Sequence, residues 1–274
     1  MCRNLALCAT ALALVLAAPG LAAAKSKDKA EAATAPAAAP APARPQKATA
    51  DQRAQAERLE PLARAAFWAH ELEIEPKDAQ AGVRLSAALR SLGRSDEAAQ
   101  AAQAVLVLDP ANRDALFELA RAYIAAGNGF YAIEPLKRLQ GADARDWRSW
   151  SLIGVAYDQV GRPADAEAAW RQALVLSPDN PAVLSNLAMH HAAKGETAQA
   201  ETLLRRAAAQ PAATIQIRQN LALILGLQGK FAEAETLTRQ DLPPEIADNN
   251  LAYLRAARGA DAAAAARSAQ TAGS

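Results

Sequence analysis

Cysteine is scarce in this chain of 274 residues, and both cysteines, Cys2 and Cys8, lie within its first ten positions. If that segment is removed, the mature protein has no thiol, which excludes disulfides, cysteine metal ligands and a cysteine nucleophile. Aromatic residues make up only 4% of the chain, while alanine is abundant, so there is little bulk for one thick globular core. Alanine has the highest helix propensity, and the composition therefore favours closely packed helices in thin layers.

A surplus of charge of one sign is also lacking. The formal net charge is +1, and residues of both signs are scattered along the chain. No basic stripe indicates a nucleic-acid partner, and no acidic tail indicates a solvating segment. We therefore expect no nucleic acid among the partners.

Motifs that would support catalysis are missing as well. The sequence has no glycine-rich phosphate loop and no G-x-S-x-G elbow. His190 and His191 are adjacent, so they point in different directions on a helix, whereas a metal site needs partners one turn apart. We expect His191 to pack against neighbouring helices and His190 to lie at the surface. The sequence predicts neither an enzyme nor a cofactor or metal site.

The first residues have the features of an export signal. Arg3 precedes an apolar run at residues 5–16, and a Pro-Gly pair and a stretch of small residues follow. This order is that of a secretory signal peptide, residues 1–24, with cleavage after Ala24. A membrane anchor is the alternative, but the apolar run is too short to span a bilayer comfortably. We predict an exported protein whose mature chain has no transmembrane span.

The segment after the signal peptide is of low complexity. Residues 25–50 are dominated by Lys, Ala and Pro, and such a composition cannot bury enough apolar surface to fold. We predict a disordered, extended linker, with a docking segment for a proline-reading partner as the alternative. Lipid anchoring at Cys8 is not expected, because this residue follows Leu7 and lies inside the apolar run.

Residues 79–248 repeat with a period of 34 residues. Three kinds of residue keep one register through five units without insertion or deletion. They are glycine (Gly93, Gly127, Gly161, Gly195 and Gly229), alanine (Ala98, Ala132, Ala166, Ala200 and Ala234) and a branched aliphatic (Leu85, Leu119, Ile153, Leu187 and Leu221). A period of this length is typical of a helical solenoid.

Each unit is interpreted as two helices, A and B. The recurring glycine ends helix A, because a residue without Cβ readily adopts the left-handed conformation found after a helix C-terminus. Helix B begins just after it, where Ser95, Pro163 and Thr197 are favoured residue types. A small residue in helix A, such as Gly154, and the recurring alanine in helix B let the two helices approach closely.

The third unit carries most of the diagnostic residues of a known repeat. Its Trp150, Gly154, Tyr157, Ala166 and Pro178 resemble the tetratricopeptide (TPR) consensus. The resemblance implies an all-α TPR solenoid with a degenerate leading repeat (45–78, helix B at about 60–74), five full repeats and a capping helix (245–258). The expected boundaries are 51–258 for the solenoid, 79–112, 113–146, 147–180, 181–214 and 215–248 for the repeats, and 259–274 for a disordered tail.

The four tryptophans are candidates for a stacking platform or for the core. Trp68, Trp150 and Trp170 fall at or next to packing positions of the repeat, so we interpret them as core residues. Trp147, at a junction between units, is expected to be exposed.

The A helices of such a solenoid line a concave groove. At positions that face it, the sequence predicts a peptide-binding groove formed by Val83, Phe117, Arg121, Ile124, Val155, Asp158, Ser185, Met189, Gln219 and Leu223. This mixed, fairly apolar wall suits an amphipathic helix or an extended peptide. Some TPR domains grip a terminal carboxylate with Lys and Asn; Asn186 and Asn220 are present here, but the lysines are not. We expect Phe117→Ala to affect partner binding more than folding.

The carboxy-terminal third narrows the family. Residues 217–229 read IRQNLALILGLQG, residues 239–245 read RQDLPPE, and residues 249–254 read NNLAYL. This run resembles the TadD-type TPR proteins of the tight-adherence (Flp) pilus assembly system, over roughly residues 150–258.

The resemblance implies a periplasmic accessory protein that helps an outer-membrane secretin to assemble or reach its site. Its implied partners are the secretin or pilus assembly subunits, and it implies no catalytic residues. Members are usually lipoproteins, and this sequence lacks a convincing lipobox. An adaptor of another envelope machine, for cell-wall synthesis or cytochrome maturation, is the alternative.

Overall fold

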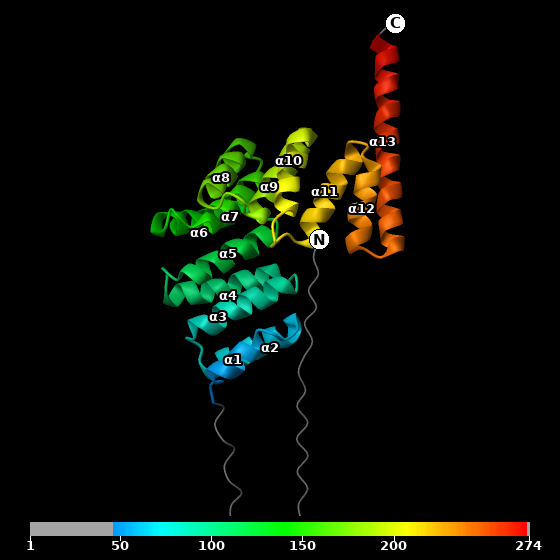
Figure 1. The fold of residues 1–274 in the computed structure, drawn as a ribbon. Coiled ribbons are helices and arrows are strands. Elements are labelled where there is room, and N and C mark those ends of the chain that lie inside the picture. The colour runs from blue at the N-terminus through cyan, green and yellow to red at the C-terminus, as the bar shows by residue number, and fades with distance from the viewer. Residues whose placement is uncertain (1–45, 273–274) are drawn as a thin grey trace, which may run out of the picture. The chain divides into compact units, whose positions relative to one another are not determined.

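The structure, a computed structural model, describes residues 46–272, and in its last helix it omits the side chains of residue 257 and of residues 260–272. The described residues form 13 helices and no strand, which confirms the all-α prediction. Figure 1 shows these helices following one another in chain order. The predicted signal peptide and most of the predicted linker, residues 1–45, lie outside the described residues.

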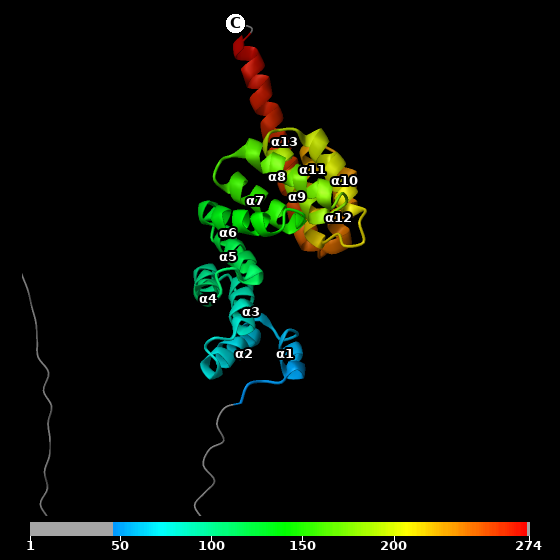
Figure 2. The same ribbon diagram turned by 90° about the vertical axis from the view of Figure 1, so that its left-hand side faces the viewer.

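The five predicted repeats each contain one A helix and one B helix. The A helices are α3 (Ala79–Ser91), α5 (Arg113–Ala125), α7 (Trp147–Gln159), α9 (Pro181–Ala193) and α11 (Ile215–Leu227). The B helices are α4 (Ser95–Leu108), α6 (Gly129–Ala142), α8 (Pro163–Leu176), α10 (Thr197–Ala208) and α12 (Phe231–Asp241). Every A helix starts at the residue at which the corresponding predicted unit starts, and Figure 2 shows the pairs from a second side.

The recurring glycine ends each A helix as the sequence predicts. The five glycines have φ between +71° and +84°, the left-handed region that a side chain with Cβ disfavours. The next residue then donates its backbone N–H to a carbonyl five positions back, as Arg162 does to Tyr157 at 2.8 Å. This is a Schellman ending, which satisfies carbonyl groups at the end of the helix.

A second recurring position, the N-cap of each A helix, is occupied by a residue with a capping side chain, and the sequence analysis missed it. The side chains of Asp78, Asn112, Asp146, Asn180 and Thr214 each accept a backbone N–H from the first turn. Their spacing equals the repeat, so the 34-residue register would have revealed them. The B helices differ, because Ser95 and Thr197 are first helical residues and neither helix has a side-chain cap.

The solenoid is held together by contacts between neighbouring helices. Each A helix packs against the B helix of its own unit and against the next A helix, from α3 through α5, α7 and α9 to α11. Within the described residues, no B helix packs its backbone against the next B helix, although Arg205 of α10 pairs with Glu233 of α12 at 2.6 Å. The A helices therefore form one continuous face, and the B helices lie behind it.

The leading unit consists of α1 (Ala50–Ala56) and α2 (Pro61–Ile74), so its helix B occupies nearly the predicted residues. Arg53 of α1 reaches across to Glu71 of α2 and to Asp78, with 2.6 Å between Arg53 Nη2 and Asp78 Oδ2. All three side chains are buried. Lys47 also pairs with Asp78, at 2.9 Å, which fixes the last residues of the predicted linker against the solenoid.

The last helix, α13 (Pro244–Ala272), is longer than the predicted cap. Ala247, Leu251 and Leu254 are buried, and α13 contacts both α11 and α12, as a cap should. The helix does not end near residue 258, however, and its backbone continues where we expected a disordered tail. The alanine-rich sequence explains this difference, because alanine favours helix without needing tertiary contacts.

The structure corrects the predicted exposure of two ring side chains, Trp147 and His190. Trp68 and Trp170 are buried as expected, and Trp150 is half-buried, but Trp147 is half-buried rather than exposed. His190, which we expected at the surface, is only 5% exposed. Its ring packs edge-on against Trp170, and its Nδ1 lies 3.0 Å from Asp158 Oδ1 on α7. The contact to α7 comes from the preceding unit, which the pattern of one helix could not show.

Candidate functional site

The face formed by the A helices holds all ten residues predicted to line a groove, but not all of them reach its surface. Phe117 and Ser185 are buried, at 3% and 6% exposure. Asp158 is exposed, and the remaining seven are half-buried. The structure gathers five of the ten into two separate hollows on this face.

The larger hollow, here called the arginine hollow, has a volume of about 410 Å³. It lies where α3, α5 and the start of α7 meet, and it includes the predicted Val83, Phe117 and Arg121. Its other charged lining residues are Arg84, Asp114, Glu118 and Arg148. The sequence analysis missed these four, although Asp114 and Arg148 occupy the second position of helix A, which the same register places on this face.

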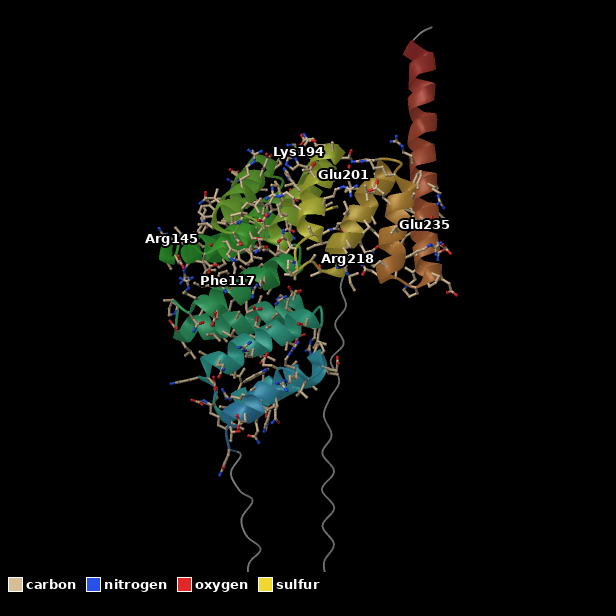
Figure 3. The ribbon with its side chains drawn as sticks, viewed as in Figure 1. Phe117, Arg145, Lys194, Glu201, Arg218 and Glu235 are labelled. Atoms are coloured by element: carbon tan, nitrogen blue, oxygen red, sulfur yellow. The ribbon has the colours of Figure 1, made fainter. Side chains whose placement is uncertain are left out.

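Phe117 forms the floor of the arginine hollow (Figure 3 labels it on α5). The guanidinium carbons of Arg148 and Arg121 lie 4.7 Å and 5.6 Å from the centre of its ring. Guanidinium groups stack favourably on aromatic faces. Phe117 is therefore a support for two arginines rather than an open apolar surface. Because its ring is buried, Phe117→Ala would also affect folding, contrary to our expectation from the sequence.

Ion pairs with buried carboxylates hold Arg121 and Arg148 in place. Glu118 accepts hydrogen bonds from Arg121, at 2.6 Å, and from Arg90, at 3.2 Å. Asp146 accepts from Arg148, at 2.6 Å between Arg148 Nη2 and Asp146 Oδ2. These hydrogen bonds from Arg148 hold the pKa of Asp146 below its ordinary value, although burial opposes the shift. Asp146 thus remains ionised at neutral pH, and the hydrogen bonds to Glu118 and Asp146 orient the guanidinium groups.

The smaller hollow, here called the amide hollow, lies between α11 and α13 and has a volume of about 270 Å³. It contains the predicted Gln219 and Leu223 together with further carboxamides and an exposed tyrosine: Gln216, Asn220, Asn250 and Tyr253. Carboxamides both donate and accept hydrogen bonds, so they can pair with a peptide backbone. The sequence placed Asn220 beside the groove, but Asn250 and Tyr253 come from the cap.

The remaining predicted residues line neither hollow. These are Ile124 on α5, Val155 and Asp158 on α7, and Ser185 and Met189 on α9. Ser185 is engaged within the solenoid, because its Oγ accepts a hydrogen bond from Asn220 at 3.2 Å. Among the described residues, no group of three or more His, Cys, Asp or Glu side chains is arranged to hold a metal ion. No helix among them is long and apolar enough to cross a membrane.

This arrangement defines a class of protein: a helical-repeat scaffold whose A helices present a continuous face to partners. A family model for the tetratricopeptide repeat matches residues 83–147 and 151–214. These two stretches, which cover most of α3 to α10, match tetratricopeptide repeats, and proteins with such repeats generally bind other proteins and are generally not enzymes. No curated protein matches the sequence.

Solved structures have the same fold. A thermophilic TPR protein from Thermus thermophilus matches with a TM-score of 0.57 and 23% identity, over 64% of this chain and 96% of that one. A tetratricopeptide repeat protein from Parabacteroides merdae matches with a TM-score of 0.64 and 14% identity, over 74% and 80%. MamA from Desulfovibrio magneticus RS-1 matches with a TM-score of 0.51 and 20% identity, over 57% and 89%.

Proposed function

We propose that this protein is a periplasmic scaffold in the assembly of a Tad/Flp-type pilus secretion system, where it helps the outer-membrane secretin to assemble or reach its site. The general role as a protein-binding scaffold follows from the repeats. The assignment to a pilus system rests on the run at residues 217–254, which resembles the last repeat and cap of TadD-type proteins.

The position of residues 217–254 in the structure supports a role for them in binding a partner. Their asparagine and glutamine side chains, among them Asn220 and Gln219, line the amide hollow together with residues of the cap. The arginine hollow lies on the same face, several units away along the chain. An extended partner segment can contact both hollows, since consecutive A helices form one face.

Deletion of the gene tests the proposal. The deletion strain should carry fewer surface pili and fewer secretin multimers than its parent, and expression of the intact chain should restore both. Pili are counted by electron microscopy, and multimers are measured by immunoblot of unheated envelope samples. Normal numbers of pili and of multimers in the deletion strain would disprove the role in pilus assembly.

Export is tested separately. The chain should be recovered from the periplasmic fraction, and the amino-terminal residue of the mature protein should be Lys25, because the signal peptide is expected to end at Ala24. Recovery of the uncleaved chain in the cytoplasm would contradict the periplasmic setting.

A second candidate function is an adaptor of another envelope machine, for cell-wall synthesis or cytochrome maturation. The TPR architecture alone supports it equally well, because the repeat does not specify a partner. Affinity purification from envelope extracts separates the two. Secretin and pilus subunits should co-purify under the first proposal, and cell-wall or cytochrome maturation factors under the second.

A further inference from the structure

The exposed layer of the arginine hollow carries mainly positive charge. The side chains of Arg84, Arg121 and Arg148 are 47%, 35% and 49% exposed. The carboxylates that pair with the last two, Glu118 and Asp146, are each only 7% exposed and lie beneath them. Arg84 pairs with Glu57, at 3.5 Å, and the Glu57 side chain is 35% exposed. Apart from Glu57 and the exposed Asp114, the charges that a molecule meets on this face are guanidinium groups.

The guanidinium groups are also held ready for a ligand. Those of Arg121 and Arg148 rest on the ring of Phe117 and are tied to buried carboxylates. Such fixing reduces the conformational entropy lost when a ligand binds. A guanidinium group has five N–H donors, so one that pairs with a carboxylate retains donors for a second one.

We propose that the arginine hollow binds an acidic segment of a partner protein, with Asp or Glu carboxylates bound by Arg84, Arg121 and Arg148. This inference rests on the proposed function, since it specifies the chemistry of a partner at the same face. An extended segment with closely spaced acidic residues fits, because the three arginines belong to three successive A helices, α3, α5 and α7. A basic segment would meet the same guanidinium groups and be repelled.

One lining residue opposes the proposed partner. Asp114 is an exposed carboxylate in the hollow and lies close enough to Arg148 to affect the pKa of that guanidinium. Removal of its charge should strengthen the binding of an acidic segment. This gain of affinity cannot be produced by a folding defect.

The test uses the purified mature chain and a fluorescein-labelled hexaglutamate peptide, with hexaglutamine as the uncharged control peptide. Fluorescence anisotropy should show binding of hexaglutamate and none of hexaglutamine, and the affinity should fall as salt is raised to about 0.15 M. The formal net charge of the chain is only +1, so general attraction to the probe is weak. Equal binding of the two peptides would overturn the proposal.

Variants locate the binding within the molecule. Arg84→Gln, Arg121→Gln and Arg148→Gln should each weaken hexaglutamate binding by about threefold or more, and Asp114→Asn should strengthen it by a similar factor. The matched control is Arg171→Gln on α8, which removes the same charge from a side chain that is 67% exposed and outside the hollow. An equal loss in Arg171→Gln, or weaker binding by Asp114→Asn, would overturn the proposal. Circular dichroism checks that each variant is folded.

The two proposals fail separately. If pilus partners co-purify equally with the wild-type chain and with a variant that combines the three arginine changes, the inference about the hollow fails and the role in assembly stands. If the deletion strain assembles pili normally while the arginine changes still abolish hexaglutamate binding, the acidic-segment site stands and the role in pilus assembly fails.

Discussion

Asp78 illustrates how one residue of this solenoid performs two tasks. Its Oδ1 accepts the backbone N–H of Ala81 at 3.0 Å and caps α3, and its Oδ2 pairs with Arg53 and Lys47. Burial would raise the pKa of Asp78, but hydrogen bonds from Arg53 and Lys47 outweigh burial and hold the pKa well below its usual range. The leading unit is thereby joined to the first full repeat.

Asp78→Asn should separate the two tasks, because Asn112 and Asn180 cap the equivalent helices and an asparagine can keep the cap. The lost ion pair should lower the free energy of unfolding by about 1–3 kcal/mol at pH 7. The folded-state pKa lies below the unfolded value of about 3.9, so the stabilisation is present above that pH and lost as pH falls. The melting temperature of the variant should therefore depend less on pH between about 2 and 4.

The control for this prediction is Asp179→Asn. Asp179 pairs with Arg206 at 3.1 Å, but its side chain is 61% exposed, and exposed pairs contribute little to stability. A loss as large as that of Asp78→Asn would show that burial of the cluster is not the cause.

The sequence predicted the contacts of individual side chains less well than it predicted the helices. The repeat register placed Phe117 on the correct face, yet the guanidinium group that stacks on its ring comes from Arg148 of the next unit. The same holds for His190, whose partner Asp158 lies on the preceding A helix. The spacing of residue types along one helix shows which face each residue occupies. It does not show contacts between side chains more than 30 positions apart, such as 117 with 148 and 158 with 190.

At the scale of elements, the sequence predicted most of what the structure shows. The glycine register predicted where each A helix ends, because the left-handed turn that follows it requires a residue without Cβ. It could not predict the length of α13, since no recurring signal follows the last repeat and the tail is rich in alanine.

The close crossing of α7 and α8 is sharply testable. A Cβ atom placed on Gly154 would lie 2.5 Å from Trp170 Nε1, so no larger residue fits without a shift. Gly154→Leu should lower the free energy of unfolding by about 1–3 kcal/mol or more, as overpacking does. The measurement is thermal or urea unfolding followed by circular dichroism.

Gly141→Leu is the matched control, because Gly141 is also helical but exposed, and a Cβ atom placed on it would have no neighbour within 4 Å. This change should be neutral or slightly stabilising, since leucine favours helix more than glycine does. An unchanged melting temperature in Gly154→Leu would contradict the close packing of α7 against α8.

At the scale of the whole molecule, stability depends on how the ends are covered. The first part of α13 places Ala247, Leu251 and Leu254 against α11 and α12. A terminal repeat without such a cover exposes its apolar face to water.

Two truncations test this role. A chain ending at residue 258 keeps the buried residues of α13 and should unfold at nearly the same temperature as the intact protein. A chain ending at residue 243 loses roughly 1.5–3 kcal/mol for each buried leucine and should melt earlier and aggregate. Equal melting temperatures for the two truncated chains would rule out the capping role of α13.

The strictly local contacts of the solenoid also have a mechanical consequence. Within the described residues, each unit contacts only the units next to it, so a pulling force applied at the two ends is carried by all units in series. One unit can then unravel while the others remain folded. A released unit of 34 residues spans roughly 110–120 Å when fully extended. Under tension the protein would lengthen in discrete steps of about this size and shorten again as each unit refolds against its neighbours.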